Sequence, residues 1–152
     1  MLRKRFIPDV AGPLLILLFA YAAASKLMIY HRFVAQIGQS PILVGVSPYL
    51  AWLIPAVELI VSILLLLPTW RLLGFYAATI LMAAFTLYIA AILTLSPEVP
   101  CSCGGILSQM GWKTHLVFNI VFTGIALAGL LSEKQLKKNG DGHIGNQLNY
   151  QA

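Results

Sequence analysis

The sequence predicts an all-α membrane protein, a bundle of four transmembrane helices that run up and down in turn. Of its 152 residues, 59% are hydrophobic and 10% are charged, whereas soluble domains carry about a quarter charged residues. Four apolar runs reach the length of about 20 residues that a helix needs to cross a bilayer. The basic residues gather at the ends of these runs, so the net charge of +5 indicates membrane orientation and not a nucleic-acid partner.

The four runs cover about residues 10–30, 49–67, 72–95 and 112–131. Lys26 interrupts the first run and Glu58 the second, while the third carries no charge. Because the connection between the second and third runs is very short, these two helices should be antiparallel neighbours. We expect one membrane domain over residues 1–132 and a polar, flexible tail over residues 133–152.

Basic residues also predict which way the chain faces, because cytoplasmic loops carry an excess of Lys and Arg. With four spans, seven basic residues share the side of both termini: Arg3, Lys4, Arg5, Arg71, Lys134, Lys137 and Lys138. The other side holds Arg32 and Lys113. We expect a multi-pass protein of the bacterial inner membrane, with both termini cytoplasmic and the loops at 31–48 and 96–111 facing outward.

A cleaved signal peptide is the alternative for the first run, since basic residues precede it and three alanines follow at 22–24. Apolar character continues through Tyr30, however, so we keep four spans. Two small-residue pairs, Gly74 with Ala78 and Gly124 with Ala128, have the spacing that lets membrane helices approach closely. Alanine is also simply common in such helices.

The chain has two cysteines, Cys101 and Cys103, and both lie in the loop that is expected to face outward, where disulfides persist. A Cys-x-Cys disulfide closes a very small ring, so it adds little stability to the fold. The strain of such a ring makes the bond easier to reduce, which suits thiol–disulfide exchange. Gly104 and Gly105 follow and leave the backbone open to a partner. The pattern favours thiol–disulfide chemistry, and a pair of inert thiols is the alternative.

A copper site is an alternative for the same loop. Cys101, Cys103, Met110 and His115 are soft sulfur and imidazole ligands of the kind that Cu(I) accepts. Met110 is equally suited to anchor the chain at the membrane interface. We therefore assign no metal ligand, and Cu(I) and quinone stay open as cofactors, although no quinone signature is readable.

Glu58 lies about ten residues into the second run, or roughly 15 Å deep at the usual helical rise. A carboxylate at that depth is costly and marks a functional site or a buried ion pair. Lys26, about one turn from the outer end of the first run, is the expected partner, unless it snorkels to the interface. Pro55 removes a helical hydrogen bond one turn before Glu58 and predicts a kink.

On the fourth run, Trp112, His115 and Asn119 share one helical face directly below the cysteine loop. His115 is suited to stabilise a thiolate or to shuttle a proton during exchange. Trp112 also fits an interfacial belt, and His115 or Asn119 could instead bridge helices by hydrogen bonds.

Three segments resemble the MauE/DoxX group of small redox-associated membrane proteins: Ser-Lys-Leu at 25–27, Pro-Ala-Val-Glu-Leu at 55–59, and Cys-Ser-Cys-Gly-Gly at 101–105 followed by Trp112, His115 and Asn119. The resemblance covers about residues 8–132, and the cysteine loop favours the MauE-like branch. It implies a four-helix bundle similar to the vitamin K epoxide reductase class. It also implies thioredoxin-like partners and a role in the maturation of disulfide-containing periplasmic proteins.

This chain departs from vitamin K epoxide reductase in having one cysteine pair where those enzymes use two, which disfavours an internal relay to a quinone. The leading hypothesis is thiol–disulfide exchange by Cys101 and Cys103 with a periplasmic thioredoxin-like partner or client. The alternatives are a Cu(I)- or cofactor-binding module that uses the same loop, and a structural or carrier bundle built around Glu58 and Lys26.

Overall fold

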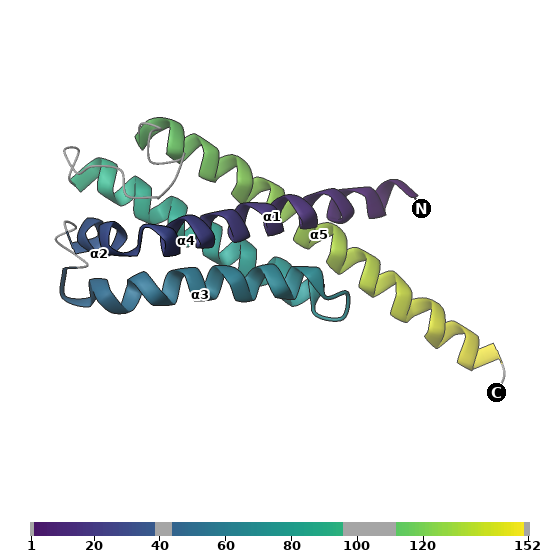
Figure 1. Cartoon of the computed structure of the whole chain (residues 1–152). Coiled ribbons are helices and arrows are strands. Elements are labelled where there is room, and N and C mark those ends of the chain that lie inside the picture. The colour runs from purple at the N-terminus through teal and green to yellow at the C-terminus, as the bar shows by residue number, and fades with distance from the viewer. Residues whose placement is uncertain (1, 39–43, 96–111, 151–152) are drawn as a thin grey trace.

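The computed structural model describes residues 2–38, 44–95 and 112–150 (Figure 1). These residues form five α-helices and one short 3-10 turn: α1 (Leu2–Met28), α2 (Tyr30–Gly38), η1 (Val44–Val46), α3 (Ser47–Leu66), α4 (Arg71–Leu95) and α5 (Trp112–Tyr150). Four of the helices, α1, α3, α4 and α5, are long and apolar enough to cross a membrane. The predicted four-helix membrane bundle is thereby confirmed.

The four long helices form a ring in which α1 and α4 each pack against both α3 and α5. The turn at residues 67–70 is short, so α3 and α4 lie side by side and antiparallel, as predicted. The start of α1 and the end of α5 lie toward one end of the bundle, called here the terminal end (Figure 1). Helix α2, the end of α4 and the start of α5 lie toward the opposite end, called here the α2 end.

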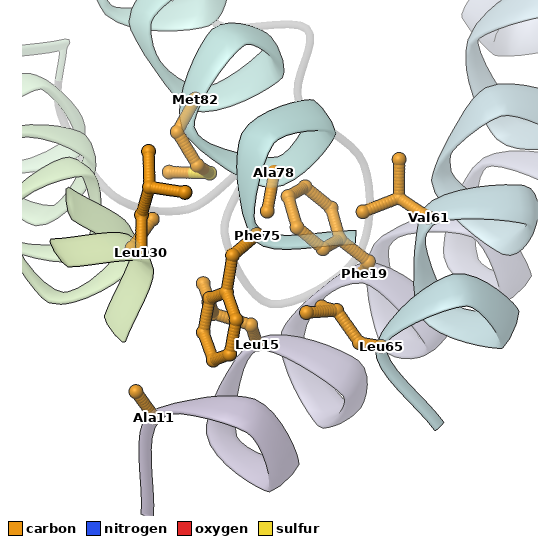
Figure 2. Close-up of a cluster of buried hydrophobic side chains, with 10 residues drawn as sticks. Ala11, Leu15, Phe19, Val61, Leu65, Phe75, Ala78, Met82 and Leu130 are labelled. Carbon is orange, nitrogen blue, oxygen red and sulfur yellow. The ribbon is translucent and has the colours of Figure 1, made fainter. Parts of the chain in front are cut away.

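Figure 2 shows an apolar core of buried side chains from the four long helices. Its residues belong to the parts of α1, α3, α4 and α5 that lie nearer the terminal end. Phe19 of α1 and Phe75 of α4 are at most 1% exposed, and Val61 and Leu65 of α3 pack with them. Because all four long helices contribute to this cluster, it fixes their relative positions. The buried side chains of Lys26, Glu58, His115 and Asn119 lie farther along the helices, toward the α2 end.

Two glycines allow close contact within this core. A Cβ atom on Gly74 would lie 2.7 Å from the backbone nitrogen of Leu65, and one on Gly129 would collide with the ring of Phe75. Gly74 therefore lets α4 approach α3, as the small-residue spacing predicts. Gly124 has nothing within 4 Å of its Cβ position, so its predicted role in packing within this chain is wrong, and Gly129 fills that role instead.

An ion-pair network ties three helices together at the terminal end. The Nη2 atom of Arg71 lies 2.8 Å from Oδ1 of Asp9, and its Nε atom lies 3.7 Å from Oε2 of Glu133. These contacts join the start of α4 to α1 and α5. In the sequence Arg71 is only an orientation signal, whereas in the structure it also joins α4 to α1 and α5.

Three boundaries differ from the expected ones, and the first is the start of α1, which lies at Leu2 and not at about residue 10. The first helix ends at Met28, and Tyr30–Gly38 forms the separate, amphipathic helix α2. The tail that was expected to be flexible continues α5 to Tyr150. Residues 133–138 are mostly good helix formers, and extending an existing helix needs no new nucleation, which explains why α5 continues past the expected span.

Candidate functional site

The centre of the candidate site is an ion pair between α1 and α3. Lys26 donates a hydrogen bond from Nζ to Oε1 of Glu58 at 2.7 Å, and the two side chains are 8% and 1% exposed. The partnership that the sequence suggested is therefore present. At this depth the attraction and the hydrogen bond between the two charges must offset the free energy that the desolvation of both groups costs.

Further contacts position the ammonium group of Lys26. Lys26 lies in the last turn of α1 and its Nζ also donates to the carbonyl oxygen of Ala22 at 3.4 Å. The same atom lies 6.0 Å and 5.8 Å from the ring centroids of Phe33 and Phe85, within the range of a cation–π contact. Aromatic rings from α2 and α4 thus flank the ammonium group.

Helix α5 contributes two buried polar side chains, His115 and Asn119, each 4% exposed. Asn119 donates from Nδ2 to the carbonyl oxygen of His115 at 3.1 Å. One turn farther, Thr123 and Thr86 of α4 have their hydroxyl oxygens 3.2 Å apart. The bond of Asn119 lies within α5, so it does not show the helix-bridging role considered for His115 or Asn119, whereas the contact between Thr86 and Thr123 joins α4 to α5.

Two atoms near the ion pair have no hydrogen-bond partner among the described residues. They are Oε2 of Glu58 and Nδ1 of His115, and both are buried. Since buried polar atoms are normally paired, two orphaned atoms in one region make it the candidate functional site of the described residues.

A cavity of about 300 Å³ brings these groups together. All five α-helices line it: Lys26 of α1, Phe33 of α2, Glu58 of α3, Tyr88 of α4, and His115 and Asn119 of α5. The rest of the wall is almost entirely apolar. An apolar pocket with a few convergent polar groups is the usual form of a small-molecule site.

Residues 4–132 match the family model of the methylamine utilisation protein MauE. The chain belongs to the MauE family. The matched segment includes all the residues that line the cavity. No curated protein and no solved structure matches the chain. Membership fits a redox-associated membrane protein, while the likeness to the DoxX group and to the vitamin K epoxide reductase class stays a prediction.

In this MauE-family protein the structure gathers four of the predicted site residues: Lys26, Glu58, His115 and Asn119. Trp112 is the first residue of α5. The remaining predicted site residues lie outside the described residues: Cys101, Cys103, Gly104 and Gly105. Met110, considered as a copper ligand, lies outside them too. Within the described ranges no three His, Cys, Asp or Glu residues form a metal-binding group.

Sequence reasoning missed the aromatic part of the MauE cavity. Phe33 and Ile37 come from α2, whose apolar residues repeat at helical spacing, so a search for short amphipathic helices would have found them. Phe85 and Tyr88 lie in an apolar span in which nothing distinguishes a cavity wall from a lipid-facing residue.

Proposed function

We propose that this protein is a redox-associated protein of the bacterial inner membrane that exchanges disulfides through Cys101 and Cys103. Its partner is a periplasmic thioredoxin-like protein or a disulfide-containing client, and the exchange supports the maturation of periplasmic proteins. One observation carries the proposal. Cys103 stands twelve residues before His115, a cavity-lining residue, and the segment with both cysteines connects the end of α4 to the start of α5, two helix ends that lie toward the α2 end of the bundle (Figure 1).

The proposed orientation puts both termini in the cytoplasm and the cysteine pair outside. The excess of basic residues on the side of the termini supports it. An even number of spans also agrees with the start of α1 and the end of α5 lying toward one end of the bundle (Figure 1). An oxidising compartment would then surround the two thiols.

The exchange balances without a further reagent. A thiolate of one cysteine attacks a disulfide of the partner and forms a mixed disulfide, and a partner thiolate leaves. The second cysteine of the pair, as thiolate, then displaces the other partner sulfur and closes the Cys101–Cys103 disulfide. The partner gains two electrons and two protons, and the pair loses the same number. The reverse sequence oxidises a client dithiol.

His115 is the residue we assign to proton transfer in this exchange. Its imidazole is buried near the beginning of α5 and its Nδ1 atom has no partner among the described residues. A neutral imidazole nitrogen accepts a proton from a thiol and returns it to the leaving group. Lys26 and Glu58 hold the helices around it.

The test replaces both cysteines by serine and measures the thiol state of periplasmic client proteins by alkylation. The Cys101→Ser/Cys103→Ser variant should accumulate clients in the wrong redox state, and each single variant should trap a partner as a mixed disulfide. Ser102→Ala, which changes the residue between the cysteines and keeps both thiols, is the matched control. Unchanged clients and no trapped partner would refute the proposal.

A further inference from the structure

We propose that the cavity around Lys26 and Glu58 binds an uncharged, lipid-soluble aromatic alcohol, the chemical class of phenols and quinols. This goes beyond the proposed function, because binding in this cavity requires neither cysteine. The cavity has a volume of about 300 Å³, at the lower end of the range for small-molecule sites, and is lined by all five α-helices.

The charges in the wall favour a neutral ligand. Lys26 and Glu58 neutralise each other at 2.7 Å, and both are buried. The remaining lining residue that can ionise near neutral pH is His115. A charged ligand would bring an uncompensated charge into an apolar cavity, which is costly at membrane depth. An uncharged ligand avoids that cost.

The orphaned acceptor requires the ligand to carry a donor. Oε1 of Glu58 accepts from Lys26, while Oε2 is buried and has no partner within the described part of the chain. A carboxylate oxygen only accepts hydrogen bonds, so a ligand hydroxyl satisfies it, and an ether, a ketone or an acyl chain does not. Nδ1 of His115 is the second orphaned atom, and it can pair with a second oxygen on the same ring.

The rest of the wall suits a ring. Phe33 and Phe85 flank the ammonium of Lys26, and Phe118 and Tyr88 also line the cavity. Aromatic side chains pack with other rings in stacked or edge-to-face arrangements. A planar aromatic head with one or two hydroxyl groups therefore matches both the apolar and the polar part of the site.

The test uses 1-naphthol and its methyl ether, 1-methoxynaphthalene, which share the ring system and differ in the hydrogen-bond donor. Binding to the full chain in lipid nanodiscs is measured by equilibrium dialysis, with empty nanodiscs as the reference for partition into lipid. We expect saturable binding of 1-naphthol at one site and an affinity for the ether that is lower by roughly tenfold or more. Equal affinities, or no saturable binding of 1-naphthol, would overturn the proposal.

Two variants place the binding in the cavity. Ala22→Leu fills space beside Lys26 and should abolish the saturable component, while Ala128→Leu adds the same atoms at an exposed position on α5 and should leave it unchanged. The Cys101→Ser/Cys103→Ser variant should bind 1-naphthol normally, which separates this site from the proposed exchange. The comparison of the two ligands needs only the unchanged protein. It therefore tests the requirement for a hydrogen-bond donor even if Ala22→Leu fails to fold.

Discussion

Replacing Lys26 by methionine removes the charge that compensates Glu58 and keeps an unbranched side chain of similar length. The Glu58 side chain is 1% exposed and its Oε1 atom accepts from Lys26 at 2.7 Å. Breaking a buried ion pair by removing one partner costs about 3–5 kcal/mol, because the other charge stays buried and unpaired. We therefore expect the unfolding equilibrium constant of Lys26→Met to rise by roughly two to three and a half orders of magnitude.

The assay is reversible unfolding in detergent micelles followed by far-ultraviolet circular dichroism. Lys113→Met removes an exposed lysine from the first turn of α5 and is the control for the loss of one positive charge. The double variant Lys26→Met/Glu58→Met should recover most of the lost stability, since an apolar pair of similar volume often replaces a buried ion pair without cost. If Lys26→Met unfolds like Lys113→Met, or if the double variant is less stable than Lys26→Met, the ion pair does not hold this site.

Three further predictions concern packing and the terminal end of the bundle. Gly129→Ala forces a Cβ atom into the ring of Phe75 and should cost about 1–3 kcal/mol in denaturant unfolding, whereas Gly124→Ala meets open space and should not destabilise the fold. Equal losses in the two would contradict the packing assigned to Gly129. Arg71→Gln breaks two partly exposed ion pairs, each worth about 0–1 kcal/mol of stability. The loss of stability should be smaller in 1 M NaCl, because salt screens such pairs. A loss of stability that salt does not change would contradict a stabilising role for the two ion pairs. Phe33→Ala removes a ring that is 4% exposed and packs between α2 and α3. It should lower the free energy of unfolding by about 3–5 kcal/mol, measured by thermal unfolding. An unchanged stability would mean that α2 does not pack against α3 at Phe33.

The sequence was sufficient for the four spans, because the length and hydropathy of a crossing helix are local properties. It was also sufficient for the partnership of Lys26 and Glu58, since a charge within a span needs a partner and few are present. The predicted end of the first helix, at about residue 30, lies two residues beyond the observed end at Met28, because apolar character continues past Met28 into α2.

What the sequence could not supply depends on how the helices pack. A cavity is a space left between side chains of separate helices, so no single segment carries a signal for it. The same holds for the glycines, because Gly124 and Gly129 both lie in the apolar part of α5 and only the packing shows that Gly129 meets Phe75. The pairing of Arg71 with Asp9 and Glu133 joins residues that are far apart in the chain, and for that reason it was missed.

The most direct test of the proposed function is the redox state of Cys101 and Cys103 in whole cells, measured by rapid acid quenching and alkylation with a mass-tagged thiol reagent. We predict a mixture of dithiol and Cys101–Cys103 disulfide that shifts within minutes when an external reductant or oxidant is added. The single-cysteine variants should at the same time form mixed disulfides with a protein partner. Two thiols that stay reduced under both treatments and trap no partner would contradict the proposal.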